Sequence, residues 1–265
     1  MKKAPLFLIA IALISLGSCQ VSTEPVQKDE LVLDYFQLKI YNYETGDQEA
    51  LLDSYLENAL LPALHRNGIR NIGVFKPIAG LNERENFLMV LTPYVSLNQL
   101  EEISGLLKND TDYQQAASDY INAPHDAPPY TRMESMILRS FTATPKLALP
   151  ELTTPRLERV YEFRSYEAAT EKLYDLKVEM FNEGESALFQ ELKFNPVFFC
   201  EVLSSAYMPH LIYLTAHADT VAQKKNWENF GAHPEWERMK NLDRYQNTVS
   251  KITKYLLYPT EYSDY

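Results

Sequence analysis

The sequence has little cysteine and little glycine, and it lacks an excess of basic residues. Cysteine occurs only as Cys19 and Cys200, which excludes a disulfide framework and a cysteine-rich zinc site. Glycine totals 8, and the chain contains neither a glycine-rich phosphate loop nor an H-E-x-x-H zinc motif. Lys and Arg number 25 against 36 Asp and Glu, a formal net charge of −11, whereas binding to nucleic acid phosphates requires a basic surface. We therefore expect no metal, no cofactor and no nucleic acid partner.

The N-terminal segment has the pattern of a bacterial export signal. Two lysines precede an apolar run from Ala4 to about Leu16, which is shorter than the roughly 20 apolar residues of a membrane-spanning helix. The run ends in L-G-S-C, which resembles the lipobox of bacterial lipoproteins. This resemblance implies a signal peptide over 1–18, a lipid on Cys19 and a tether over 19–32. We expect an exported protein, lipid-anchored in the bacterial cell envelope on the periplasmic or surface side of the outer membrane. The alternative is an ordinary signal peptide cut elsewhere.

The rest of the chain contains one pattern twice. A shift of 123 residues aligns Tyr43-Glu44 with Tyr166-Glu167, Val74-Phe75 with Val197-Phe198, and Thr92 with Thr215. Between the copies, residues 144–157 carry three prolines, which is typical of an extended, semi-rigid linker. We therefore predict two repeats, at 33–143 and 158–265.

Each repeat has the order β-α-β-β-α-β, which is the ferredoxin-like arrangement. The hydrophobic periodicity predicts strands around 36–40, 69–77, 87–94, 133–141, 159–166, 195–203, 210–217 and 251–258. It predicts helices over 47–66 (ended by Gly68), after Ser96, and over 112–121, 169–191, 219–230 and 234–247.

An antiparallel sheet with helices on one face leaves its other face partly apolar. We assign Tyr41, Val160, Ile212 and Leu214 to that uncovered face. Two copies on one chain can bury these faces against each other. The fold class is therefore α+β, with two tandem ferredoxin-like repeats packed sheet to sheet.

Short motifs of the second repeat resemble those of NIPSNAP domains. The motifs are Y-E-F-R-S-Y at 161–166, H-P-E-W at 233–236 and L-L-Y-P-T-E-Y-S at 256–263, and the first repeat adds G-L-N at 80–82. The family belongs to the dimeric α+β barrel superfamily, so the resemblance implies that the two sheets close into a barrel within one chain. It also implies a binding or scaffold module, although other superfamily members are cofactor-free monooxygenases, haem-degrading enzymes or isomerases.

Four polar residues of the second repeat are candidates for a ligand-binding site. Glu162 and Arg164 lie two apart on one predicted strand and share a face, so they form either an internal ion pair or a site where the arginine receives an anionic ligand. Tyr213 and His217 lie on another strand, and an imidazole titrates near neutral pH, as a pocket acid or base requires. His233 precedes a predicted helix, where a capping role is expected. No catalytic residue is assigned.

Two other features indicate packing rather than chemistry. Trp227 and Phe230 have helical spacing, which is typical of a packing stripe. Cys200 lies in an apolar run and is expected to be a buried, inert thiol.

These patterns favour a lipid-anchored envelope protein whose repeats bind a small molecule or a protein. One alternative is a cofactor-independent monooxygenase or isomerase, with Arg164, Tyr213 and His217 in a pocket between sheet and helices. Another is a structural protein–protein interaction module. Each of these is compatible with a further homo-oligomer.

Overall fold

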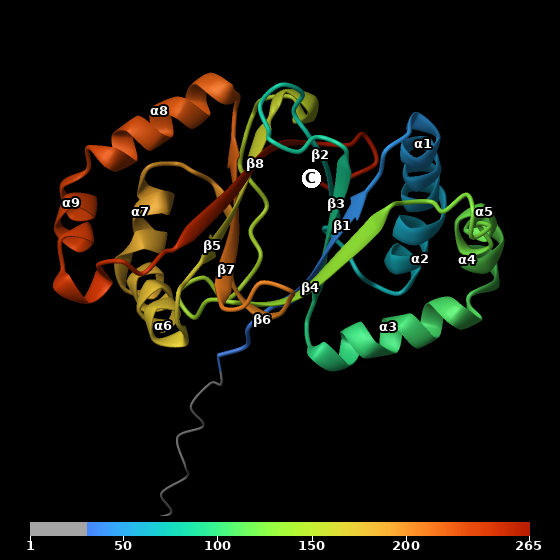
Figure 1. Ribbon diagram of the computed structural model, residues 1–265, viewed down its shortest axis with the longest axis horizontal. Helices are drawn as coiled ribbons and strands as arrows, with labels where there is room; N and C mark the ends of the chain where they lie inside the picture. Colours follow the sequence, from blue (N-terminus) through green and yellow to red (C-terminus); the bar gives the residue numbers. More distant parts are fainter. Residues whose placement is uncertain (1–30) are drawn as a thin grey trace, which may run out of the picture. The chain divides into compact units, whose positions relative to one another are not determined.

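Eight strands, four from each repeat, close into one barrel with helices on its outside (Figure 1). The structure is a computed structural model that describes residues 31–265. The predicted signal peptide, Cys19 and nearly all of the tether at 19–32 lie outside the described residues.

The elements follow the predicted order in both repeats. The first contains β1 (Tyr35–Asn42), α1 (Gly46–Tyr55), a π-helical turn (Leu56–Leu60), α2 (Leu61–Arg66), β2 (Gly73–Pro77), β3 (Phe87–Tyr94), α3 (Leu97–Asn109), α4 (Thr111–Ala116), α5 (Ser118–Ile121) and β4 (Arg132–Ser140). The second contains β5 (Val160–Glu167), α6 (Glu171–Met180), a π-helical turn (Phe181–Glu185), α7 (Ser186–Glu191), β6 (Pro196–Ser204), β7 (His210–His217), α8 (Thr220–Gly231), α9 (Pro234–Lys240) and β8 (Lys251–Pro259).

All neighbouring strands are antiparallel, in the closed order β1-β3-β2-β8-β5-β7-β6-β4. The sheets of the two repeats join at two seams. At one seam β2 pairs with β8, with Phe75 opposite Pro259, and at the other β4 pairs with β6, with Ser140 opposite Cys200. Closure leaves neither sheet with an open edge, which removes the usual site of edge-to-edge aggregation. The predicted α+β class and sheet-to-sheet packing are therefore confirmed.

The strand alternation places one set of side chains in the barrel and the other under the helices. Ile212 and Leu214 lie inside the barrel, as predicted. The assignment of Tyr41 and Val160 to the same face is wrong. Tyr41 packs in the cluster beneath the helices of the first repeat, and Val160 precedes the barrel-facing Tyr161, so it points outward. The error arises because both faces of these strands are buried, so hydrophobicity alone does not distinguish them.

Local helix signals agree with the predicted ends, with one exception. The hydroxyl of Ser96 accepts a hydrogen bond from Gln99 N at 3.2 Å, and Gly68 adopts the left-handed conformation, with φ of +79°. Nδ1 of His233 accepts from Glu235 N at 3.2 Å, which confirms its capping role. The helix predicted over 234–247 instead ends at Lys240, since a 3₁₀ turn and left-handed Asn247 follow.

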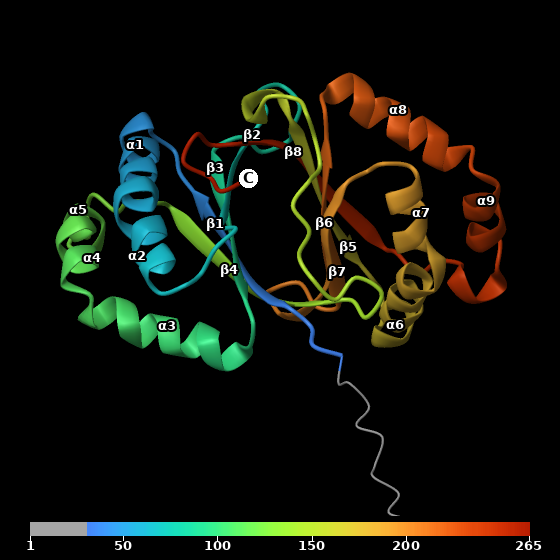
Figure 2. The ribbon, with the colours of Figure 1, turned by 180° about the vertical axis from the view of Figure 1, so that it is seen from behind.

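The proline-rich segment 144–157 crosses one end of the barrel, and we call it the strap (Figure 2). Its side chains Leu147 and Leu152 pack against the barrel core. Asp34, just before β1, accepts a hydrogen bond from Leu147 N at 3.0 Å and pairs with Lys146 at 2.8 Å. The C-terminal Tyr265 is also buried in this core. This end of the barrel is therefore filled by the strap and the C-terminus.

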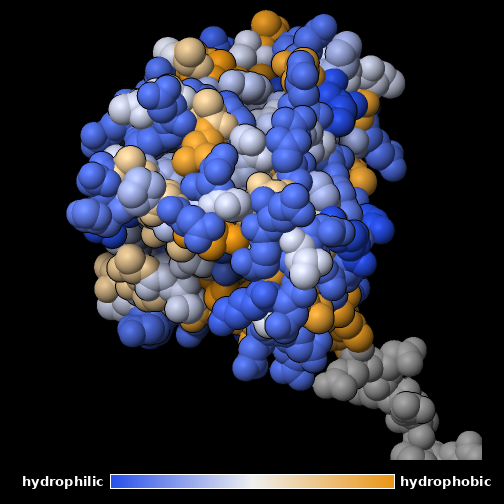
Figure 3. All heavy atoms as spheres, turned by 90° about the vertical axis from the view of Figure 1, so that its right-hand side faces the viewer, coloured by the Kyte–Doolittle hydropathy of each residue, from blue (hydrophilic) through white to orange (hydrophobic). Residues whose placement is uncertain are grey.

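The helical face of the first repeat carries mainly hydrophilic side chains with small, separate hydrophobic spots (Figure 3). Among residues 31–265, no helix combines the length and the apolar character needed to cross a bilayer. Cys200 is fully buried in the barrel core, where burial raises its pKa, so the predicted burial of this thiol is confirmed.

Candidate functional site

The four predicted site residues meet on the outer face of the second sheet, beneath α8. Glu162 is fully buried, and its Oε1 accepts a hydrogen bond from Arg164 Nε at 2.7 Å. Its Oε2 accepts from Gln223 Nε2 at 2.7 Å and from Trp227 Nε1 at 2.6 Å. Both carboxylate oxygens therefore accept hydrogen bonds from protein donors. Of the two predicted arrangements, this is the internal ion pair and not the open anion site.

Arg164 is held on several sides. Its guanidinium carbon lies 3.9 Å from the centre of the Trp227 ring, a cation–π contact. Its Nη1 donates to the hydroxyl of Tyr166 at 3.3 Å, and that hydroxyl is 2.7 Å from the hydroxyl of Tyr213. Burial raises the pKa of Tyr213 well above its ordinary value, so this phenol stays protonated.

His217 joins the same network as a neutral imidazole. Its Nδ1 accepts from Asn226 Nδ2 at 3.1 Å, so its Nε2 carries the proton and faces Thr215 Oγ1 at 3.2 Å. Nε2 also lies 3.8 Å from Oε2 of Glu162. Burial lowers the pKa of His217 to about 4; nearby Glu162 opposes this shift and Arg164 adds to it. The ring of Phe194 packs against the imidazole, with centroids 5.3 Å apart, so the space beside it is filled by protein.

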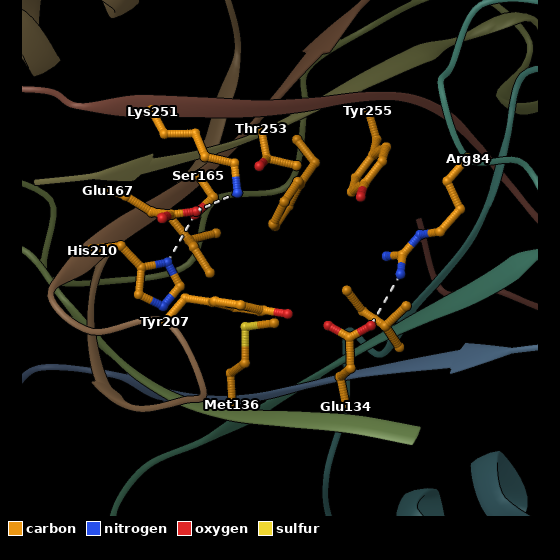
Figure 4. A pocket seen from close by; sticks show the side chains of 13 residues that line it. Arg84, Glu134, Met136, Ser165, Glu167, Tyr207, His210, Lys251, Thr253 and Tyr255 are labelled. Atoms are coloured by element: carbon orange, nitrogen blue, oxygen red, sulfur yellow. Dashed lines mark hydrogen bonds and ion pairs between the residues drawn. The ribbon is translucent and has the colours of Figure 1, made fainter. Parts of the chain in front are cut away.

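A cavity of about 170 Å³ opens instead inside the barrel, at the end away from the strap (Figure 4). It is lined by Ile40, Arg84, Glu134, Met136, Phe163, Ser165, Glu167, Tyr207, His210, Ile212, Lys251, Thr253 and Tyr255. Most of these residues are barrel-facing positions near the ends of β1, β4, β5, β7 and β8. We call this space the mouth cavity.

His210 occupies one wall of the mouth cavity between two serine hydroxyls. Its Nδ1 lies 2.7 Å from Ser165 Oγ on β5, and its Nε2 lies 2.7 Å from Ser205 Oγ in the loop between β6 and β7. Ser205 also accepts a hydrogen bond from Tyr207 N at 3.0 Å, which fixes the loop beside the imidazole. Burial lowers the pKa of His210 to about 4, with Glu167 opposing the shift, so the ring is neutral at pH 7.

Two ion pairs stand on opposite sides of the mouth cavity (Figure 4). Arg84 Nη1 lies 3.0 Å from Glu134 Oε1, and Lys251 Nζ lies 3.0 Å from Glu167 Oε1. The Arg84 guanidinium also lies 5.4 Å from the centre of the Tyr255 ring, which helps to orient it. The charges of the lining are therefore balanced in pairs.

Between these polar groups the lining is apolar. Met136, Phe163 and Ile212 belong to the barrel core, and the exposed Tyr207 covers part of the opening. A concave apolar site with a few convergent polar groups is the usual form of a small-molecule site. In the described part of the chain, no group of three or more His, Cys, Asp or Glu side chains is arranged to hold a metal ion.

The sequence reasoning did not identify the mouth cavity. Its polar residues come from both repeats, and only the closed barrel brings Glu134 and Arg84 opposite Lys251 and Glu167. One local pattern could have indicated the cavity. Ser165 continues the barrel-facing series of Tyr161 and Phe163, and a polar residue at such a core position requires a hydrogen-bond partner.

Comparisons with known proteins agree with this fold. Residues 161–264 match the family model described as NIPSNAP. No curated protein matches the chain.

Among solved structures, a proposed monooxygenase from Lactobacillus acidophilus is 7% identical, with a TM-score of 0.56 over 86% of this chain and 94% of its own. A proposed monooxygenase from Fusobacterium nucleatum is 7% identical, with a TM-score of 0.54 over 86% and 93%. An uncharacterised NIPSNAP-like domain protein from Burkholderia xenovorans is 14% identical, with a TM-score of 0.37 over 40% and 90%. The first two likenesses concern the fold of nearly the whole described chain.

Proposed function

We propose that this chain, whose residues 161–264 match the NIPSNAP family model, is a lipid-anchored envelope protein that binds a small molecule in the mouth cavity. The observation that carries the proposal is the combination of an apolar floor with His210 and two ion pairs around one opening. The network around Glu162, by contrast, is saturated by protein donors and serves as structural support for the sheet beside the cavity.

The binding proposal is tested by thermal shift with a panel of small metabolites. A ligand at a hundred times its Kd stabilises the folded state by about 2.7 kcal/mol, which raises the Tm of a domain this size by roughly 5–10 °C. Thr253→Trp, which fills the cavity from β8, should abolish the shift. Ile252→Trp is the matched control, because Ile252 is 52% exposed and lies outside the cavity.

Two results would contradict this proposal. One is a stabilising ligand whose shift survives Thr253→Trp, which would place its site elsewhere. The other is a panel without any stabilising compound, together with capture of a defined protein partner by the wild type and by both variants. That outcome would favour the interaction module.

A second candidate is cofactor-independent oxygenation or isomerisation. The neutral His210 in a half-enclosed cavity favours it, because such an imidazole can exchange a proton with a bound substrate. Oxygen uptake with one-ring phenols, lost in His210→Gln and retained in His217→Gln, is the expected result for an oxygenase. Equal uptake by both variants and by buffer alone would eliminate this candidate.

The lipid anchor rests on the L-G-S-C motif that ends at Cys19. Within the described chain, β1 starts at the strap end of the barrel, away from the mouth cavity. Cys19→Ser should release the protein from the membrane fraction, whereas Ser18→Ala keeps a small residue before the cysteine and should remain bound. A Cys19→Ser protein that stays membrane-bound would contradict the anchor.

A further inference from the structure

The size and the lining of the mouth cavity indicate which class of ligand it selects, an inference that rests on the proposed binding function. The cavity measures about 170 Å³, and an apolar cavity of about 150 Å³ is large enough for benzene. A ligand that fills it therefore has roughly the size of one ring.

The charges of the lining disfavour an ionic ligand. Arg84 is paired with Glu134 and Lys251 with Glu167, and the imidazole of His210 is neutral. A charged ligand would have to compete with one of these pairs or lose part of its hydration without a counter-charge in a half-enclosed site, and each of these costs some free energy. A neutral ligand meets neither cost.

One polar contact offered to such a ligand is the hydroxyl of Ser165, beside those of Thr253, Tyr207 and Tyr255. This side chain is 8% exposed, and His210 Nδ1 is its hydrogen-bond partner within residues 31–265. A serine hydroxyl has one donor and two acceptor positions, so one contact with the imidazole leaves Ser165 with capacity directed to the cavity.

The neutral imidazole has two tautomers, and the two serines satisfy both. With the proton on Nδ1, His210 donates to Ser165 and accepts from Ser205, so the Ser165 hydrogen is free for a ligand carbonyl. With the proton on Nε2, His210 donates to Ser205 and accepts from Ser165, so the Ser165 oxygen is free to accept from a ligand hydroxyl. The imidazole keeps one N–H in both arrangements, and no proton is gained or lost.

We propose that the Ser165–His210–Ser205 chain is a tautomeric adaptor that lets the mouth cavity bind neutral one-ring compounds in both hydroxyl and carbonyl forms. Ser165 contacts the ligand, His210 acts as a positioning residue, and Ser205 completes the second hydrogen bond in either arrangement. The ligand class is thus a small neutral phenol or alcohol, together with the corresponding aldehyde or ketone.

Binding of defined probes tests the class. Thermal shift and titration with phenol, benzaldehyde and toluene should give binding, whereas benzoate and benzylammonium should not bind. Ser165→Ala removes one hydrogen bond worth about 0.5–1.5 kcal/mol, so it should weaken phenol and benzaldehyde about 2- to 12-fold and leave toluene unchanged. Ser204→Ala, at an exposed serine next to Ser205, is the matched control and should change none of them.

The adaptor itself is tested by the ¹⁵N chemical shifts of His210, which distinguish the protonated from the bare ring nitrogen. Phenol should shift the tautomer balance toward Nε2–H and benzaldehyde toward Nδ1–H. The signal is assigned with His210→Gln or, should that variant not fold, by elimination with variants of the other four histidines. A merely structural histidine would keep one tautomer with both ligands.

The outcomes separate the two proposals. If both probes bind in the cavity but the tautomer does not change, the adaptor is refuted and the binding function stands. If charged probes bind and neutral ones do not, the ligand class is refuted while the cavity remains the site. If no probe binds and Thr253→Trp changes nothing in the wider panel, both proposals fail.

Discussion

At the scale of single residues, the two repeats carry different polar groups at matching positions of their first strands. The shift of 123 places Lys39 at the position of Glu162 and Tyr41 at that of Arg164. In the second repeat these positions form an ion pair closed by Trp227. The same two strand positions thus carry a buried ion pair in the second repeat, and a half-buried lysine and a packed tyrosine in the first.

Glu162→Gln should destabilise the protein strongly. The amide leaves the Arg164 guanidinium without its counter-charge in a site where Glu162 is fully buried, and breaking a buried pair costs about 3–5 kcal/mol. Urea unfolding gives the free energy. Glu235→Gln, which breaks an exposed pair with Arg238, is the control and should leave the free energy of unfolding nearly unchanged. Equal losses in the two variants would refute the structural role of the buried pair.

The free energy of unfolding should decrease as the pH falls from about 6.5 to about 4, in part because of His217. Its folded pKa is lowered to about 4, below the ordinary value of about 6.5, so the unfolded chain binds more protons in this window. The neutral imidazole therefore contributes stability above pH 6.5, and up to about 3 kcal/mol is lost as the pH falls to 4.

His217→Gln isolates that contribution. Urea unfolding of the variant and the wild type at several pH values should show a shallower decline for the variant in this window. His210, whose pKa is also lowered to about 4, continues to titrate in both proteins. Parallel curves would mean that His217 is not held neutral by burial.

At the scale of elements, the strap and the C-terminal residues cover one end of the barrel. Leu147 and Leu152 cover one end of the barrel, and Tyr265 contacts the rings of Phe75 and Tyr161 with centroids 5.4 Å and 6.0 Å apart. Ser263 Oγ accepts a hydrogen bond from Val74 N at 3.0 Å, which ties this terminus to β2. The barrel is thereby filled at one end and open at the other.

Tyr265→Ala should cost about 3–5 kcal/mol, the usual loss for removing a buried aromatic ring. Tyr265→Phe is the matched control. The buried hydroxyl of Tyr265 has no hydrogen-bond partner within the described chain, so removal of this hydroxyl should be neutral or slightly stabilising. Denaturant unfolding measures both. A Tyr265→Ala protein as stable as the wild type would show that the ring does not support the barrel core.

At the scale of the whole molecule, each sheet supplies half of one core. Phe36 on β1 stacks on Phe198 of β6 with ring centroids 5.3 Å apart, and Phe75 on β2 lies 4.9 Å from Tyr161 of β5. These contacts cross between the repeats, as do both seams. Neither repeat can bury its barrel face alone.

The separate repeats should therefore not fold as monomers. Residues 31–143 or 144–265 produced alone should self-associate or give the circular dichroism of an unfolded chain. The two pieces produced together should co-elute as one folded complex in size-exclusion chromatography. A stable, monomeric single repeat with a native-like spectrum would contradict the shared core.

Several features of the fold could be predicted from local pattern. The alternation of Phe36, Leu38 and Ile40, the left-handed Gly68 and the cap at His233 each depend on residues adjacent in sequence. The four candidate residues of the second repeat also meet, but at a closed network. The face assigned to Tyr41 was wrong because both surfaces of its strand are covered.

The sequence by itself determined the strands and helices, because hydrophobic periodicity and capping act over a few residues. It also determined the duplication and the need to cover the apolar face of each sheet. The tertiary structure decided which face each residue occupies, that the linker closes the barrel, and that Ser165, His210 and two ion pairs surround one cavity. Those groups come from strands far apart in the chain. Their meeting depends on barrel closure, and no local pattern encodes it.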